Sequence, residues 1–447
     1  MKNIIILIAA VLLIGCSTTP KKEVHLKGQL KNMSDKQHVL IYNGVSSFIG
    51  KSRDIRLSVD ENGYFDTIIP LEKPEYYSIS RSLLYLTPGD DLEITLSQDH
   101  SEAQFTGKGS EANNYLKNRL YPQGGSFLES GKNVLNDFSS TCSLIDSLAS
   151  IRHAEIDTLS GISEIFRDLE KARITADVIN SYIFYMYYAK ELKNMSSKEE
   201  FMNFRSKHAE SITGLVNPLY KQITDDKYLD VTVVRNVFSY RKDYEQWFNG
   251  VEESAFQNAL FRAAEYANDL DNGLTPEKLS EIISALPEFS DAAIVKELEV
   301  KIGKAQKLQS GQPAPDFIFT DTSGNEKRLS DLKGKTVYID FWATWCGPCL
   351  AESPHFEKLA GKFTNKNIVF LPVSVDSTSD IWLKFLEAHK KQLPQYHSAD
   401  PNLSENWNIR FIPRFVLIDK ESKIINAYAS RPSETEIEEL LKTFLTD

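Results

Sequence analysis

The chain has 447 residues, of which 41% are hydrophobic and 25% are charged, a composition that is typical of globular proteins and excludes a disordered or fibrous chain. Its 51 Lys and Arg against 62 Asp and Glu give a net charge of −11, which excludes a basic footprint for nucleic acid. Four cysteines are too few for a disulfide scaffold, so any redox role must come from particular cysteines. At roughly 150 residues per domain, the length predicts about three domains.

The first residues have the pattern of an export signal. Lys2 precedes an uninterrupted apolar run at residues 4–14. A helix of that length rises only about 16 Å, roughly half of the hydrocarbon core of a bilayer, so the run is too short to span a membrane. The pattern therefore predicts a secretory signal peptide at residues 1–15. No later window holds 18 consecutive apolar residues.

The end of this segment, Leu13-Ile14-Gly15-Cys16, resembles the lipobox of bacterial lipoproteins. The resemblance implies that Cys16 carries lipid and that residues 16–22 form a polar tether. We therefore expect a lipid-anchored protein of the cell envelope that faces the periplasm, on either the inner or the outer membrane. The alternative is a plain signal peptide in which the cysteine occurs by chance.

Residues 23–108 predict a small antiparallel β domain, either a sandwich or a barrel. Short apolar runs are separated by turn residues, with Asn62-Gly63 as a hairpin signal and Pro88-Gly89-Asp90-Asp91 as a second turn. The expected strands are Glu23–Leu30, Val39–Tyr42, Ile55–Val59, Tyr64–Ile69, Leu83–Leu86 and Leu92–Leu96.

Residues 109–306 predict an all-helical domain, because apolar residues recur at helical spacing in Asn180–Leu192, Val251–Leu270 and Pro276–Ala285. Cys142 lies on an apolar stripe with Phe138 and Ile145. We expect it to be a buried free cysteine, with an intermolecular or regulatory thiol as the alternative. The whole sequence lacks HExxH, GxGxxG and Walker-type loops, so we expect neither a metal site nor a cofactor.

Residues 307–447 predict an α/β domain whose sheet is covered on both faces. The expected strands are Val337–Phe341, Ile368–Val375, Phe415–Ile418 and Lys423–Tyr428. The expected helices are Cys349–Phe363, Asp380–Lys391 and Glu434–Leu445.

A closely spaced cysteine pair carries the chemistry of this domain, in the stretch Trp345-Cys346-Gly347-Pro348-Cys349. The pair falls where a buried strand ends and a helix begins, and free backbone N–H groups together with the helix dipole favour a thiolate there. A thiolate attacks disulfides, and a second sulfur one helical turn away can resolve the mixed disulfide. Half of a zinc site is the alternative, but no second Cys or His pair lies at a suitable spacing.

The WCGPC motif and its flanks, over about 140 residues, resemble thioredoxin and the envelope thiol–disulfide oxidoreductases related to TlpA and ResA. The resemblance implies a thioredoxin fold with Cys346 as nucleophile and Cys349 as resolving thiol. Asp340 matches a buried aspartate of thioredoxin, and Glu352 matches an acid that the envelope members carry near the active site. Ile412-Pro413 matches the family's cis-proline.

These matches imply roles for the site residues, each with an alternative. Asp340 is expected to relay a proton to or from the resolving thiol, or else to be a satisfied structural carboxylate. Glu352 is expected to be a site acid, or else a solvated helix residue. Trp345, Ile412 and Pro413 are expected to bind substrate, because a backbone edge beside the sulfurs can pair with a peptide, with an ordinary trans proline at Pro413 as the alternative.

Two neighbours of this edge depart from the family pattern. Many relatives have glycine where Phe411 stands, and a small residue or threonine where Arg414 stands. We expect both residues to flank the substrate groove and to affect the choice of substrate.

The sequence as a whole predicts a membrane-tethered thiol–disulfide oxidoreductase that reduces disulfides of envelope proteins through Cys346 and Cys349. The resemblance implies a membrane electron relay of the DsbD type as its reductant. One alternative is an envelope binding protein whose β and helical domains capture a ligand or partner. Another is a thiol peroxidase, although the sequence before Cys346 lacks the Pro-x-x-x-Thr-x-x-Cys pattern.

Overall fold

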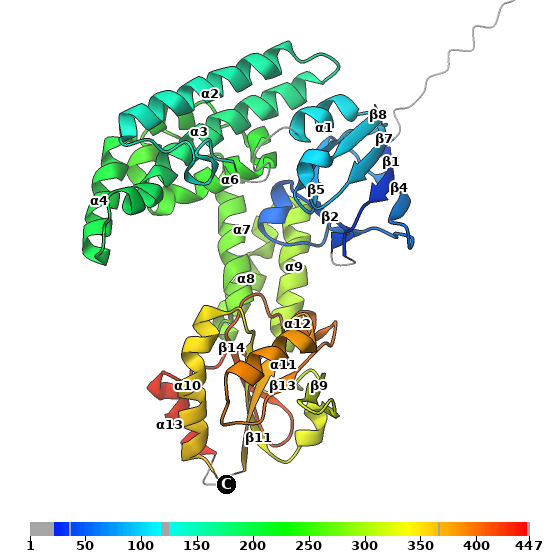
Figure 1. Cartoon of the computed structure of the whole chain (residues 1–447), viewed down its shortest axis with the longest axis vertical. Helices are drawn as coiled ribbons and strands as arrows, with labels where there is room; N and C mark the ends of the chain where they lie inside the picture. The colour runs from blue at the N-terminus through cyan, green and yellow to red at the C-terminus, as the bar shows by residue number, and fades with distance from the viewer. Residues whose placement is uncertain (1–21, 35–36, 118–124, 365–366, 445–447) are drawn as a thin grey trace, which may run out of the picture. The chain divides into compact units, whose positions relative to one another are not determined.

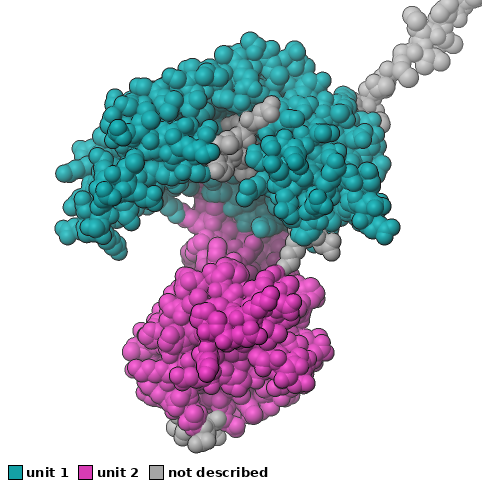
Figure 2. All heavy atoms as spheres, in the orientation of Figure 1, with its two compact units in different colours: residues 1–258 teal, residues 259–447 magenta. Residues whose placement is uncertain are grey.

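The computed structural model describes residues 22–444, except residues 35–36, 118–124 and 365–366. The predicted signal peptide and the lipidation site Cys16 lie outside the described residues. Contacts divide the chain into two compact units, residues 1–258 and 259–447, coloured teal and magenta in Figure 2. No helix in the described part of the chain is long and apolar enough to cross a membrane.

The first unit begins with two four-stranded sheets that share one hydrophobic core, which makes this part a β sandwich. One sheet has the order β4-β1-β7-β8, with β1 (Glu23–Leu30), β4 (Tyr64–Pro70), β7 (Asp91–Leu96) and β8 (Gln104–Lys108). The other has the order β3-β2-β5-β6, with β2 (Val39–Tyr42), β3 (Ile55–Arg56), β5 (Glu75–Ile79) and β6 (Ser82–Leu86). Both sheets bury alternate apolar residues against each other.

The sandwich corrects two expectations. The Asn62-Gly63 turn forms, with Gly63 at φ +83°, but it does not close a hairpin, because β3 pairs with β2 and β4 pairs with β1. The domain is also not wholly antiparallel, since β1 and β7 run parallel. The chain passes through the other sheet before it returns as β7, and such a long crossover permits a parallel pair.

Helices make up the rest of the first unit. They are α1 (Ser110–Lys117), α2 (Phe138–Thr158), α3 (Glu164–Leu192), α4 (Lys198–Ser211), α5 (Thr213–Tyr220) and α6 (Thr232–Ser239). Cys142 on α2 is a free cysteine and is half-buried. Burial raises the pKa of the Cys142 thiol to about 11, so the thiolate is disfavoured at neutral pH.

Three helices join the second unit ahead of its sheet: α7 (Ala255–Asn272), which begins just before the boundary, α8 (Pro276–Ala285) and α9 (Ala292–Lys307). The division by contacts therefore lies earlier in the chain than the domain boundary predicted at residue 307. Leu308, the C-cap residue of α9, contributes to this grouping, because it packs in the core of the α/β sheet.

The second unit contains a seven-stranded mixed sheet with the order β10-β9-β13-β12-β11-β14-β15. Its strands are β9 (Ile318–Asp321), β10 (Glu326–Arg328), β11 (Thr336–Trp342), β12 (Ile368–Ser374), β13 (Tyr396–His397), β14 (Arg414–Ile418) and β15 (Ile424–Asn426). Its helices are α10 (Gly347–Lys362), α11 (Ser379–Ala388), α12 (Leu403–Asn406) and α13 (Thr435–Thr443). Strands β11, β12 and β13 run parallel, whereas β14 is antiparallel to β11.

Alternation along the central strand β11 creates two cores. Val337, Ile339 and Phe341 pack on the face that α12 covers, together with Leu403. Tyr338 packs on the other face, which α10 and α13 cover (Figure 1). This is the thioredoxin-like fold predicted for residues 307–447, and it places Asp340 on the face of α10.

Candidate active site

The two cysteines lie at the start of α10, directly after the central strand. Cys346 is the N-cap residue, and its Sγ accepts a hydrogen bond from the Cys349 backbone N at 3.2 Å. Pro348 lies in the first turn, where a missing N–H costs nothing. The sulfurs form a disulfide with a Cα–Cα distance of 5.3 Å, and only 4% of Cys346 and 1% of Cys349 is exposed. Once reduced, Cys346 would lie at the positive end of the helix dipole, which favours its thiolate.

Exposed aromatic residues flank the buried disulfide. Trp345, directly before Cys346, is 72% exposed, and Phe411 is 75% exposed. Phe411 belongs to the loop of residues 409–413, whose Ile412 carbonyl oxygen is 3.7 Å from Cys346 Sγ. The Ile412–Pro413 peptide bond is cis, as the sequence predicts. A free backbone carbonyl next to a reactive sulfur can accept a hydrogen bond from an extended peptide.

Asp340 is a buried carboxylate on β11, and only 3% of it is exposed. Its Oδ1 has no hydrogen-bond partner among the described residues, which contradicts the alternative of a satisfied structural carboxylate. Burial, against the opposing charge of Lys391 and with a smaller contribution from the charge of Glu352, raises the pKa of Asp340 to about 8. A group that titrates near neutral pH can both accept and release a proton.

Glu352 is buried on α10, so the alternative of a solvated helix residue is wrong. Its carboxylate accepts hydrogen bonds from the Ser433 backbone N at 3.2 Å and from Ser433 Oγ at 2.9 Å. Arg431 lies 3.8 Å away. These contacts connect α10 to the segment that precedes α13, and Glu352 acts on Asp340 through its charge.

Lys391 is a further group at the site, and no sequence pattern indicates it. Lys391 lies in the loop after α11, donates to Ser353 Oγ at 2.6 Å and places its ammonium 5.4 Å from the centroid of the Trp342 ring. Burial lowers the pKa of Lys391, while the charges of Glu357 and Asp340 oppose the shift. Because Lys391 lies in a polar stretch of a loop, nothing in the sequence indicates that it lies near Asp340.

Asp376 fixes the backbone just before the cysteines. It accepts hydrogen bonds from Thr344 N at 3.0 Å and Thr344 Oγ1 at 2.8 Å, and a third from Ser374 Oγ at 2.7 Å. Asp376 follows β12, and the carboxyl ends of neighbouring parallel strands meet at one edge of a sheet. That rule could have identified Asp376 from the sequence.

Arg414 is not a groove residue, which corrects the expectation from the sequence. It is 9% exposed, and its Nε donates to the Ala427 carbonyl oxygen at 2.7 Å. Its guanidinium carbon lies 3.2 Å from the centroid of the Tyr428 ring. Strand β14 pairs with both β11 and β15, and at Arg414 the side chain packs inward against the residues that follow β15. Of the two residues that depart from the family pattern, Phe411 is exposed and Arg414 is buried.

The fold and the paired cysteines at a helix N-terminus define a thioredoxin-like oxidoreductase. Residues 309–442 match the family model described as Redoxin. The chain is 30% identical over 139 residues to the thiol-disulfide oxidoreductase ResA of Bacillus thuringiensis subsp. konkukian, covering 31% of this chain and 80% of the relative. It is 32% identical over 133 residues to ResA of Geobacillus kaustophilus, covering 30% of this chain and 76% of the relative.

Among solved structures, the thioredoxin domain of a thiol-disulfide oxidoreductase from Bacteroides vulgatus is 29% identical, with a TM-score of 0.29, covering 31% of this chain and 99% of that one. Another Bacteroides vulgatus protein, assigned as a thiol-disulfide oxidoreductase, is 58% identical, with a TM-score of 0.31. The match covers 32% of this chain and 100% of that one. By its sequence relatives, the chain belongs to the ResA-like family of thiol–disulfide oxidoreductases. It is an oxidoreductase, and the matched part is its C-terminal domain.

Proposed function

We propose that this oxidoreductase is a membrane-tethered reductase of disulfides in proteins of the cell envelope. The observation that carries the proposal is the Cys346–Cys349 disulfide at the start of α10, flanked by Trp345 and by the Ile412 carbonyl. The site has a nucleophile, a resolving sulfur and an edge for a polypeptide. The Gly347-Pro348 dipeptide resembles that of reducing thioredoxins, which favours the direction of reduction.

The proposed reaction begins with the reduced pair. The Cys346 thiolate attacks one sulfur of the substrate disulfide, forms a mixed disulfide and releases the other substrate sulfur as a thiolate, which takes up a proton. Cys349 then loses its proton, for which Asp340 is the proposed base, and attacks Cys346. The second substrate thiol leaves, and the two electrons that reduced the substrate have come from the pair, which ends as the disulfide.

The oxidised pair must be reduced again for a second turnover. We propose a membrane electron relay of the DsbD type as the source of these electrons. Such a relay would attack the Cys346–Cys349 disulfide by the same chemistry in the opposite direction.

Replacing Cys349 with alanine should trap proteins on Cys346. Without the resolving sulfur, the mixed disulfide persists, so non-reducing gels of the native envelope should show covalent complexes that mass spectrometry can identify. Both protein clients and a membrane thiol carrier should be found among them. The matched control is Cys142→Ala, which removes a cysteine from the first unit. If the variant forms no covalent complexes but binds a partner strongly without a covalent bond, the result would favour the alternative function of a binding protein.

Replacing Cys16 with serine should release the protein from the membrane. We infer the tether from the resemblance of residues 13–16 to a lipobox, because a lipid-modified cysteine would hold the exported chain at a bilayer. Labelling with palmitate and fractionation of the envelope should show label and membrane association in the wild type, and the loss of both in the variant. Equal labelling of the two proteins would contradict the tether. The same labelling of Cys142→Ser is the control.

A further inference from the structure

The loop of residues 409–413 is held from both ends by contacts within the second unit. It connects α12 to β14 and carries both the Ile412 carbonyl and the exposed Phe411. We call it the docking loop, since the proposed function places the substrate polypeptide against it. A loop that must present one carbonyl next to a buried sulfur needs a fixed backbone, because a small displacement weakens the alignment of the reacting groups.

The first anchor is an ion pair between the loop and α7. Arg410 Nε lies 3.6 Å from Asp271 Oδ1, and Asp271 is at the C-terminal end of α7. The other oxygen of Asp271 accepts a hydrogen bond from the ammonium of Lys301, on α9. The Lys301 side chain is 4% exposed and that of Asp271 is 18% exposed, so water screens this group only in part. One carboxylate therefore connects the loop to two helices.

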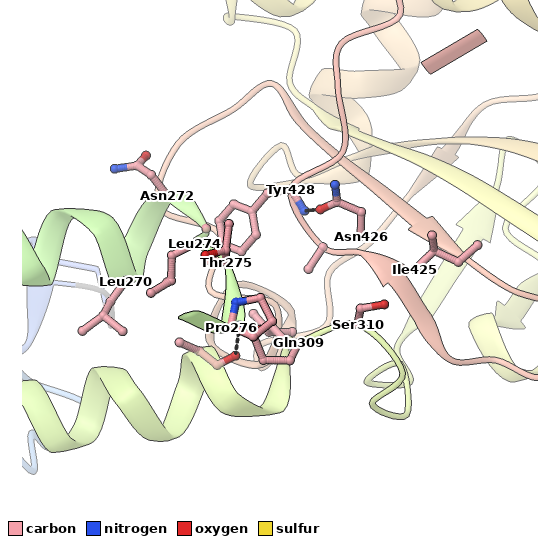
Figure 3. A pocket seen from close by; sticks show the side chains of 14 residues that line it. Leu270, Asn272, Leu274, Thr275, Pro276, Gln309, Ser310, Ile425, Asn426 and Tyr428 are labelled. Atoms are coloured by element: carbon pink, nitrogen blue, oxygen red, sulfur yellow. Dashed lines mark hydrogen bonds between the residues drawn. The ribbon is translucent and has the colours of Figure 1, made fainter. Parts of the chain in front are cut away.

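The second anchor is the ring of Tyr428, which contacts residues on both sides of the loop. Asn408 Nδ2 donates to the Tyr428 hydroxyl at 3.2 Å, and the guanidinium of Arg414 stacks on the ring. The ring also packs on Gly273, where an added Cβ would lie 2.4 Å from it. Figure 3 shows Tyr428 with Leu274 and Thr275 around a pocket of about 410 Å³ at this junction.

Both anchors end on the same turn, Asp271-Asn272-Gly273. We propose that this end of α7 positions the docking loop, with Asp271 and Arg410 as positioning residues for the binding of protein substrates. The inference rests on the proposed function, because it concerns the loop against which a substrate polypeptide would pair. It gives helices α7 and α9 a role in selecting polypeptide substrates, although neither helix contributes an atom to the disulfide.

The test replaces Arg410 with glutamine in the full-length chain. With dithiothreitol as the reductant, we expect the KM for insulin to rise about fivefold while kcat stays within about twofold. The variant loses one partly buried ion pair, and that loss should weaken the binding of insulin without changing the chemical step. The reaction of the reduced protein with 5,5′-dithiobis(2-nitrobenzoate) should keep its rate, because this small disulfide needs only the sulfur. Arg410→Lys, which retains the charge, should recover most of the insulin KM.

The matched control is Glu405→Gln. It breaks the 2.7 Å ion pair between Lys304 on α9 and Glu405 on α12, which joins α9 to the same domain through side chains outside the docking loop. Equal insulin KM values for Arg410→Gln, Glu405→Gln and the wild type would overturn the inference and leave the proposed function standing. A wild type that reduces neither insulin nor the small disulfide would instead overturn the proposed function.

Discussion

Replacing Cys346 with serine should abolish the reduction of insulin disulfides, with a loss of roughly 1,000-fold or more, because a hydroxyl cannot replace the thiolate nucleophile. Serine is the appropriate substitution because Cys346 is the N-cap of α10 and accepts a hydrogen bond from Cys349 N. Serine oxygen makes the same cap, so the helix should keep its start. The measurement is the turbidity of insulin with dithiothreitol, after subtraction of the rate without protein.

The matched control for this loss is Cys142→Ser. Cys142 is the free cysteine among the described residues of the first unit, and burial raises its thiol pKa, so it should contribute nothing to the reaction. We expect wild-type activity from this variant. Full activity in Cys346→Ser, or a large loss in Cys142→Ser, would contradict the assignment of the redox pair.

Replacing Asp340 with asparagine should stabilise the oxidised protein at neutral pH by on the order of 4 kcal/mol. The carboxyl has a pKa of about 8 in the folded chain and an ordinary value of 3.8, so the folded state binds more protons than the unfolded state between these values. The free energy of unfolding of the wild type should therefore fall as pH rises from about 4 to about 8. Asparagine has no such proton to lose.

Guanidinium unfolding at several pH values measures this effect. The increase in the free energy of unfolding caused by Asp340→Asn should be near zero below about pH 4. It should grow through neutral pH and level off above about pH 8. Asp380→Asn, at an exposed residue in the first turn of α11, is the control for the loss of an aspartate at the surface and is measured at the same pH values. A gain that does not depend on pH would contradict a raised pKa for Asp340.

The same measurement tests the charges around Asp340. Lys391 lowers the pKa of Asp340, whereas burial and Glu352 raise it. In Lys391→Met, the pH range over which Asp340 titrates should therefore move upward, and in Lys390→Met, at an exposed neighbour, it should not.

The Asp340→Asn variant should also slow insulin reduction at pH 7 by roughly tenfold or more, if the carboxylate takes the proton of Cys349.

Local features of the fold could be predicted from the sequence, while the pairing of distant strands could not. Alternating apolar residues predict β1, and a short apolar run predicts β2, each with the bounds that the structure has. The parallel pairing of β1 with β7 depends on how strands far apart in the chain share one core, which no local pattern specifies. Strand β5 was missed because all five of its residues are buried, so it lacks alternation.

The active site likewise has residues that sequence motifs predict and residues that only tertiary packing brings there. Cys346, Cys349 and the Ile412–Pro413 bond belong to motifs, so their places could be predicted. Lys391 reaches the site from a loop, and its approach to Asp340 depends on tertiary packing alone. Arg414 follows Pro413 in the chain, yet its side chain packs on Tyr428 instead of beside Cys346. Adjacency in sequence does not fix the direction of a side chain at the start of a strand.

The anchors on Asp271 and Gly273 have an evolutionary consequence. A recombination event at residue 307 would transfer the cysteines and the whole sheet but would separate Asp271 from Arg410 and Gly273 from Tyr428. An event near residue 259 would keep these partners together. We therefore expect residues 259–447 to be inherited together, because an exchange within this unit separates the docking loop from its anchors.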